Sequence, residues 1–207
     1  MSNNTATIKT RKNLVSTGTI TMTALLAAIS YVLAFLEFPV PLSPSFARMD
    51  LSDLPALIGA FAFGPVTGVM IELIKNILQL LSTSTGGIGE LANFLMGAFY
   101  VLAAGFIYKY KKTRKMAMWA CVISSVVMGI AAAIVNYFIL LPLFETFMPL
   151  DQLIASFGEF LPFIKTKLDV VLFNALPFNI LKGLVIGAIA MMIYKKLTPI
   201  LKGENLK

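Results

Sequence analysis

Long apolar runs are the feature that most limits what this chain can fold into. They lie at about 19–38, 54–81, 91–108, 117–141 and 172–194. A helix needs roughly 17 to 25 such residues to cross the hydrocarbon core of a bilayer, and each run reaches that length. With a mean hydropathy of +0.85, the chain is predicted to be an all-α integral membrane protein for which lipid is the main solvent.

The number of crossings depends on the run at 54–81, which is longer than one span requires and contains Gly64 and Pro65. Proline kinks or ends a helix, so this run is either one bent helix or two helices joined by a turn. Three basic clusters hold 12 of the 17 Lys and Arg: Lys9, Arg11 and Lys12; 109–115; and Lys195, Lys196, Lys202 and Lys207. The positive-inside rule places all three on the cytoplasmic side, which six spans allow and five do not.

We therefore predict one domain of six transmembrane helices at 17–197, with cytoplasmic tails at 1–16 and 198–207. The second helix, at 54–63, is only about 15 Å long and too short to cross alone. We expect its neighbours to shield it while the segment 39–53 dips into the membrane.

Three connections share the outer face in this topology, and we expect them to cover a ligand pocket. They are the proline-containing segment 39–53, the small polar and glycine loop 82–89, and the long acid-containing stretch 142–171. Helical spacing of apolar residues in the last of these predicts a short interfacial helix, although an ordinary solvated linker is also compatible with its polar half. The residues concerned are Leu150, Leu153, Ile154 and Phe157.

Composition excludes several functions. The net charge of +7 comes largely from the three clusters next to membrane helices, which orientation and anionic lipid explain without nucleic-acid binding. The chain has no His, and Cys121 is its one cysteine, so neither a zinc, haem or iron–sulfur site nor a Ser-His-Asp catalytic set is expected. We expect no metal, no cofactor and no catalytic residue.

One predicted helix carries polar groups at membrane depth. In "IELIKNILQLL" the residues Glu72, Lys75, Asn76 and Gln79 fall within an arc of about 100° on one helical face. Charges in a bilayer are costly, so they normally pair, face a bundle interior or a cavity, and mark a ligand or ion route. Glu72 and Lys75 are spaced to pair. The alternative is that all four groups only hold helices together.

Other helices repeat this chemistry toward the same outer side. The polar residues are Glu90, Asn93, Asn136, Tyr137, Asn174, Asn179 and Lys182. Amides donate and accept hydrogen bonds and lysine donates, so the set suits a neutral or weakly acidic ligand rich in carbonyl, imide and hydroxyl groups. Four interleaved aromatic residues are candidates to flank a flat ring, although core packing is the commoner role: Phe46, Phe94, Tyr137 and Phe178.

The first predicted helix offers a surface for another helix. Ala24 and Ala28 in "TALLAAISYVLA" form a small-x-x-x-small step with Ala27 beside it, and such steps let helix backbones approach closely in membranes. Packing within the chain explains this step equally well.

Several unusual motifs occur in one order along the chain: "MDLSDLPALIGAFAFGPVTGV", "ELIKN", "STGGIGELANFLMGA", "NYFILLP" and "PFNILKG". Together they resemble the riboflavin-specific substrate-binding (S) subunits of prokaryotic energy-coupling factor (ECF) transporters. The likeness extends from about residue 20 to 200 and is weakest at 142–171.

The resemblance implies a multi-pass protein of the prokaryotic cell membrane that binds riboflavin, as transported ligand, from outside. It also implies a complex with a transmembrane coupling subunit, docked on Ala24, Ala27 and Ala28, and two ATPases. Ligand binding is then expected at Asn136, Asn179 and Lys182 first, followed by Asn93, Lys75 and the backbone near Leu51. The helical face adds Asn76, Glu72 and Gln79, and Tyr137 completes the expected set.

Other readings remain open at this point. One is an S subunit for a different vitamin or aromatic heterocycle, which pocket composition alone does not separate from riboflavin. Another is a small membrane enzyme acting on lipid head groups or isoprenoids, which would usually need a metal-binding acidic motif or a catalytic His. A third is a purely structural membrane subunit.

Overall fold

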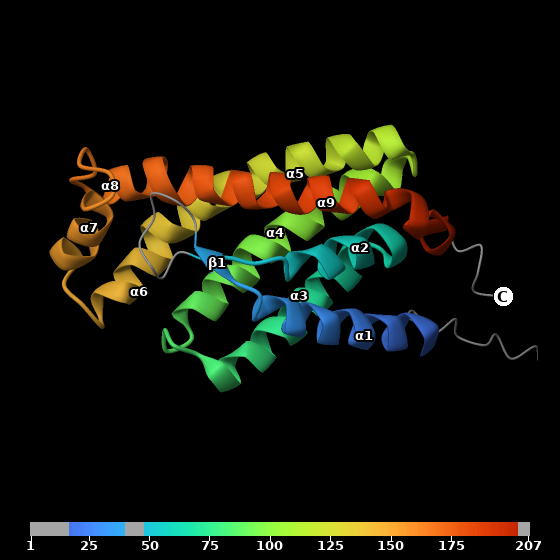
Figure 1. Cartoon of the computed structure of the whole chain (residues 1–207), viewed down its shortest axis with the longest axis horizontal. Helices are drawn as coiled ribbons and strands as arrows, with labels where there is room; N and C mark the ends of the chain where they lie inside the picture. The colour runs from blue at the N-terminus through green and yellow to red at the C-terminus, as the bar shows by residue number, and fades with distance from the viewer. Residues whose placement is uncertain (1–16, 40–47, 203–207) are drawn as a thin grey trace, which may run out of the picture.

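The computed structural model describes residues 17–39 and 48–202, which form an elongated bundle of helices (Figure 1). Its α-helices are α1 (Thr17–Ala34), α2 (Asp53–Phe63), α3 (Pro65–Gln79), α4 (Ile88–Tyr110), α5 (Arg114–Val135), α6 (Leu141–Glu145), α7 (Leu150–Gly158), α8 (Lys167–Val170) and α9 (Leu176–Lys202). One 3-10 turn, η1 (Leu80–Ser82), and two π-helical turns, η2 (Asn136–Leu140) and η3 (Val171–Ala175), interrupt them. Strands β1 (Phe38–Pro39) and β2 (Arg48–Met49) pair antiparallel.

The predicted break at Gly64 and Pro65 is confirmed. Gly64 separates α2 from α3 with φ of 105°, a backbone conformation that residues with a Cβ rarely adopt. Pro65 opens α3 at its first position, where the missing N–H has no helical partner to lose. The turn packs on α4, because a Cβ added to Gly105 would lie 2.9 Å from Pro65.

The short second helix is shielded by its neighbours, as expected. Seven of the 11 residues of α2 are buried, and the helix contacts α1, α3, α4 and α9. Asp53 begins it, so a carboxylate starts a helix inside the bundle. Among carboxylates, the sequence analysis placed Glu72 at membrane depth, and the structure adds Asp53, which has no exposed surface.

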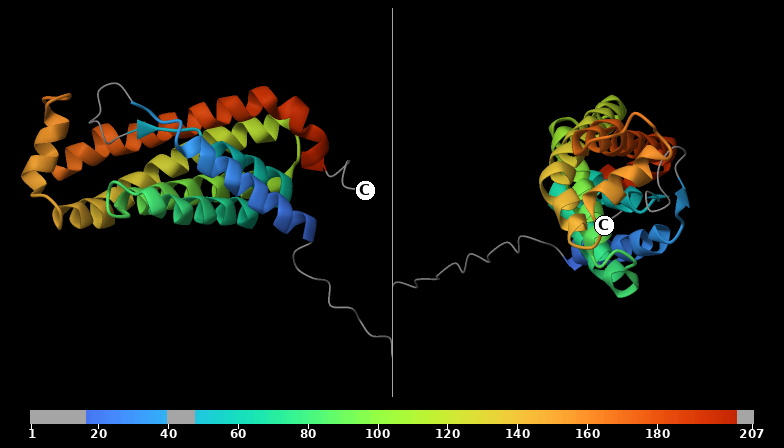
Figure 2. Two further views of the ribbon diagram at one scale, coloured as in Figure 1. Left: turned by 60° about the horizontal axis from the view of Figure 1, so that its bottom comes forward. Right: turned by 90° about the vertical axis from the view of Figure 1, so that its left-hand side faces the viewer.

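Within the described residues, four helical stretches are long and apolar enough to cross a membrane: Thr17–Ala34, Ile88–Tyr110, Arg114–Glu145 and Lys167–Ile193. Helices α2 and α3 are shorter, with 11 and 15 residues. The start of α1, the connection from α4 to α5 and the end of α9 lie at one end of the molecule (Figures 1 and 2). The turn between α3 and α4 and the helices α6 to α8 lie toward the other end.

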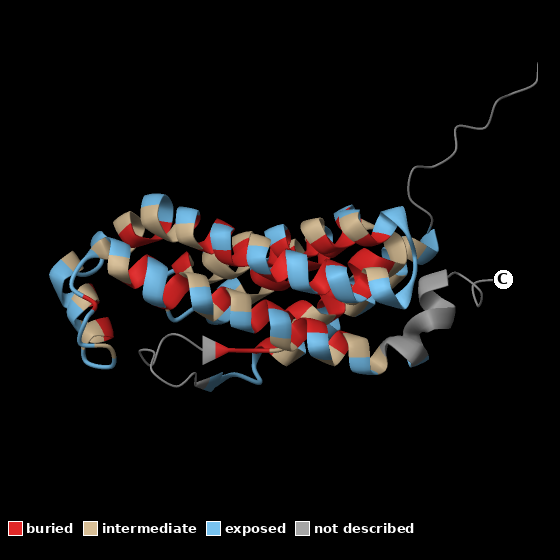
Figure 3. Ribbon diagram, turned by 90° about the horizontal axis from the view of Figure 1, so that it is seen from above, coloured by how far each residue is buried: buried red, intermediate tan, exposed pale blue. Residues whose placement is uncertain are grey.

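Buried and exposed residues alternate along the helices (Figure 3), and the buried set includes small and polar side chains while many large apolar ones are exposed. Ala56, Ala104 and Ala120 are fully buried, whereas Val32 and Trp119 are more than half exposed. Lipid is as apolar as these side chains, so close packing of small residues and internal hydrogen bonds hold such helices together. One such bond joins Tyr100 Oη to the Gly183 carbonyl oxygen at 2.8 Å.

Helices α6 to α8 form a cap at one end of the bundle, opposite the start of α1 and the end of α9 (Figure 1). The predicted short helix within 142–171 is present as α7, which buries Leu153 and Phe157 while Leu150 and Ile154 are half-buried. These side chains belong to an apolar cluster separate from the main core. The π-helical turns η2 and η3, which the sequence analysis did not predict, join this cap to α5 and α9.

Candidate ligand-binding site

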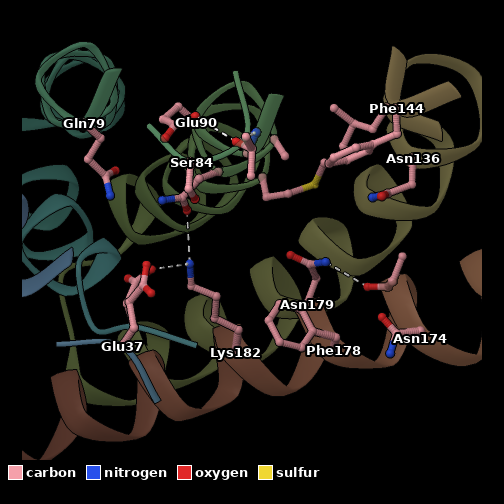
Figure 4. Close-up of a pocket in the computed structure, with 18 of the residues that line it drawn as sticks. Glu37, Gln79, Ser84, Glu90, Asn136, Phe144, Asn174, Phe178, Asn179 and Lys182 are labelled. Atoms are coloured by element: carbon pink, nitrogen blue, oxygen red, sulfur yellow. Dashed lines mark hydrogen bonds and ion pairs between the residues drawn. The ribbon is translucent and has the colours of Figure 1, made fainter. Parts of the chain in front are cut away.

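A cavity of about 660 Å³ lies near the cap end of the bundle, where the end of α3, the first part of α4, the turns η2 and η3 and the start of α9 meet (Figure 4). Its volume falls within the usual range for small-molecule pockets. Its polar lining residues are Glu37, Asp50, Gln79, Ser84, Thr85, Glu90, Asn93, Asn136, Asn174, Asn179 and Lys182, and its aromatic ones are Phe144, Phe157 and Phe178. The lining therefore combines apolar rings with amide, carboxylate and ammonium groups.

Two asparagines present acceptor oxygens to this cavity. The Nδ2 of Asn136 donates to the carbonyl oxygen of Ala132 at 2.8 Å, and that of Asn179 donates to the carbonyl oxygen of Ala175 at 2.8 Å. Because a carbonyl only accepts, the contacting atom must be the amide nitrogen in each case. This leaves the Oδ1 atoms of Asn136 and Asn179 as acceptors for a ligand that carries N–H or O–H groups.

Lys182 and Asn93 present donors instead. The ammonium of Lys182 donates to Asn93 Oδ1 at 3.1 Å and lies 3.0 Å from Asp53 Oδ2 and 3.7 Å from Asp50 Oδ2. Asn93 thereby uses its oxygen, which leaves its NH₂ group to donate. Lysine has three N–H donors, and one hydrogen bond and one close ion pair leave a further donor for a ligand carbonyl or hydroxyl.

Lys75 does not line the cavity and lies in a closed set of contacts. Its ammonium is 2.7 Å from Glu72 Oε2, 2.8 Å from Asp53 Oδ1 and 2.9 Å from Ser52 Oγ, and the side chain has no exposed surface. Three acceptors for three N–H donors satisfy a buried lysine completely. The predicted pairing of Glu72 with Lys75 is confirmed, and Lys75 has no N–H left for a ligand.

The structure brings five of the predicted binding residues together in the cavity lining: Gln79, Asn93, Asn136, Asn179 and Lys182. The Oε1 of Gln79 is buried without a hydrogen-bond partner in the described part of the chain. The other five predicted residues are not in the lining: Leu51, Glu72, Lys75, Asn76 and Tyr137.

These five residues have other surroundings. Leu51 packs against the main core, and Asn76 Nδ2 donates to the carbonyl oxygen of Glu72 at 2.8 Å. Tyr137 packs against the cap cluster and lies under Lys167, whose Nζ is 4.6 Å from its ring centre. Of the four aromatic candidates, Phe178 lines the cavity, Phe94 and Tyr137 do not, and Phe46 lies outside the described residues.

The sequence analysis missed Asp50 and Asp53, two of the three carboxylates that lie beside the two lysines. Asp50 lines the cavity and Asp53 bridges Lys75 and Lys182. A signal for them existed, because two lysines inside a membrane bundle require counter-charges, and "ARMDLSD" supplies two acids beside the start of a helix. Glu37, Phe144 and Phe157 were missed because their sequence neighbourhood gives no such signal.

The three alanines predicted to form a docking surface on α1 lie on two different faces of the helix. Ala24 and Ala28 are exposed, while Ala27 is 1% exposed and packs in the main core. Ala24 and Ala28 are therefore not covered by any described part of the chain and are available to a neighbouring helix.

Among the described residues, no group of three or more His, Cys, Asp or Glu could hold a metal ion.

Known proteins share this chain's sequence and fold. Riboflavin transporter RibU of Staphylococcus aureus (strain TCH60) is 37% identical over 180 residues, covering 86% of this chain and 89% of that protein. Riboflavin transporter FmnP of Bacillus subtilis (strain 168) is 34% identical over 179 residues, covering 85% of this chain and 90% of that protein.

A solved structure of another protein has the same fold as this chain. It is the S component of a bacterial ECF transporter, which superposes with a TM-score of 0.70 at 36% identity over 89% of this chain and 98% of that chain. The family described as "ECF transporter, substrate-specific component" matches residues 18–194. The chain therefore belongs to the ECF transporter family, as a substrate-specific component.

Proposed function

We propose that this chain is the riboflavin-binding subunit of an ATP-driven vitamin uptake transporter and captures its ligand from the extracellular side. The observation that carries the proposal is the cavity of about 660 Å³ in which Asn93, Asn136, Asn179 and Lys182 converge. The relatives named as riboflavin transporters support riboflavin as the ligand.

The chemistry of the lining suits a flavin. Riboflavin has a flat ring system, an imide edge that both donates and accepts, and a ribityl chain of hydroxyls. The acceptor oxygens of Asn136 and Asn179 match an imide N–H or a hydroxyl, and the donors of Asn93 and Lys182 match ring carbonyls. Phe178 offers an apolar face to the ring, and Gln79 offers its unpartnered oxygen to a hydroxyl.

The same proposal places the chain as a multi-pass protein of the prokaryotic cell membrane, with six crossings and both termini in the cytoplasm. Four helical stretches have the length and hydropathy of membrane spans, and α2 and α3 supply the remaining two crossings within the bundle. The turn at Gly64 and the basic residues Lys109 and Lys112 line one shallow hollow, which supports a turn on the cytoplasmic side.

Transport then depends on partners. This sequence contains no G-x-x-x-x-G-K-[ST] nucleotide-binding loop. A transmembrane coupling subunit and two ATPases therefore supply the energy. Membership of the ECF family supports an association with such subunits. The exposed residues Ala24 and Ala28 of α1 support this helix as the docking face, because small side chains permit close helix approach.

The test is direct. The chain is purified alone in mild detergent, washed and denatured, and the visible absorption spectrum of the released material is recorded. We expect a flavin spectrum at about one equivalent or, for a ligand-free preparation, quenching of added riboflavin fluorescence. A colourless preparation that leaves riboflavin fluorescence unchanged would remove riboflavin as the ligand, and other vitamins and aromatic heterocycles would then be screened in the same way.

A further inference from the structure

Asp53 stands at the junction of three segments of the bundle. It begins α2 and directly follows the segment 48–52, in which Asp50 lines the cavity. Its Oδ1 is 2.8 Å from Lys75 Nζ on α3, and its Oδ2 is 3.0 Å from Lys182 Nζ on α9. A single carboxylate therefore divides its two oxygens between two ammonium groups that come from different helices.

The two lysines differ in what remains available to a ligand. All three N–H donors of Lys75 are taken by Asp53, Glu72 and Ser52, and the residue does not line the cavity. Lys182 lines the cavity and keeps a donor. Lys75 can therefore influence a ligand only through the shared carboxylate of Asp53.

We propose that Asp53 is a positioning residue for the ligand site: backed by Lys75, it holds the Lys182 ammonium in the place where that ammonium meets the ligand. This inference rests on the proposed function. Lysine has a long flexible side chain, and fixing its ammonium before binding removes part of the entropy cost of association. Asp50 contributes less to this placement, because its Oδ2 is 3.7 Å from Lys182 Nζ, beyond hydrogen-bond distance.

The surrounding contacts make the proposal testable without leaving a buried charged group with no polar partner. In Asp53→Asn, Lys75 keeps Glu72 at 2.7 Å and Lys182 keeps Asn93 at 3.1 Å with Asp50 at 3.7 Å. In Lys182→Met, Asp53 keeps Lys75 at 2.8 Å, and Asp50 loses Lys182 but still accepts a hydrogen bond from the Ser52 N–H at 2.7 Å. Each change therefore leaves every remaining charged group with a partner of opposite sign or a hydrogen bond, which favours folding of both variants.

The experiment is a double-mutant cycle on the full chain in detergent, with the dissociation constant for riboflavin measured by fluorescence quenching. We expect Asp53→Asn and Lys182→Met each to raise the dissociation constant about tenfold or more. If Asp53 acts through Lys182, adding Asp53→Asn to Lys182→Met produces no further rise. Asp151→Asn removes an exposed carboxylate from α7, outside the cavity lining, and serves as the control with unchanged affinity.

Two outcomes overturn the positioning role. One is an additive cycle, in which Asp53→Asn weakens binding equally with and without Lys182, as a general loss of structure would. The other is unchanged affinity in Asp53→Asn. If Asp53→Asn does not give a monodisperse protein, Asp53→Glu, which keeps the charge and moves it by one methylene, enters the same cycle with the same expectation. Failure of the unmutated chain to bind riboflavin is a separate result that removes the proposed function itself.

Discussion

At the scale of single residues, Asn179 and Asn76 make the same hydrogen bond in different surroundings. Each is buried and donates from Nδ2 to the carbonyl oxygen four residues earlier, at 2.8 Å, but only Asn179 lines the cavity. We predict that Asn179→Ala weakens riboflavin binding by about 1 kcal/mol or more, because a ligand donor loses its acceptor. Titration of riboflavin fluorescence with the purified variant measures this change.

Asn76→Ala is the matched control for that prediction. It removes an equivalent internal hydrogen bond to Glu72, so any general effect of losing such a bond appears in both variants. We expect its riboflavin affinity to stay within about twofold of the unmutated chain, since no ligand contact is lost. Equal weakening by both substitutions would mean that loss of the internal hydrogen bond, and not loss of a ligand contact by Asn179, lowers the affinity.

At the scale of elements, α1 carries small residues both on its buried face and on its exposed face. Ala27 packs in the core, while Ala28 is exposed on a helix whose exposed surface also carries the larger apolar side chains of Ile29 and Val32. We predict that Ala28→Leu leaves riboflavin binding by the isolated chain unchanged but lowers riboflavin uptake severalfold, because a larger side chain prevents close helix approach. Uptake by cells and recovery of the complex by affinity purification measure the effect.

Ile29→Phe provides the comparison for α1. Ile29 is 43% exposed, and its substitution also enlarges an outward-facing side chain, but about 100° around the helix from Ala28. We expect normal uptake from this variant. Normal uptake by Ala28→Leu as well would show that α1 does not dock through its alanine step, and the search for the docking face would move to another helix.

At the scale of the whole molecule, the two ends of the bundle are expected on opposite sides of the membrane. Lys112 lies in the connection from α4 to α5, and Ser82 ends the short turn that follows α3; both are exposed. We predict that a membrane-impermeant maleimide labels Ser82→Cys on intact cells and Lys112→Cys only after permeabilisation. The reason is the excess of basic residues at the end that contains Lys112.

The natural Cys121 is 4% exposed, so it should give little background in this labelling. The unmutated chain is the control for it. Labelling of Lys112→Cys on intact cells would reverse the orientation, and labelling of both variants on the same side would contradict a membrane crossing by α4.

Several features of the fold follow from local sequence alone. Runs of apolar residues long enough for a bilayer predict helices because a backbone in lipid must satisfy its own hydrogen bonds. Gly64 and Pro65 predict the break between α2 and α3, because proline ends a helix and glycine accepts positive φ. The i, i+3 spacing of Glu72 and Lys75 predicts their ion pair, which forms at 2.7 Å.

Only the tertiary structure decided which polar residues face the cavity. Lys75 and Lys182 are both lysines within predicted membrane helices, yet one is closed off by Glu72, Asp53 and Ser52 and the other lines the cavity. Helical periodicity shows which residues share a face of one helix, but the partners of that face come from segments distant in sequence. Asp53 reaches both lysines because α2 begins inside the bundle, and that placement depends on the packing of α2 against α1, α3, α4 and α9.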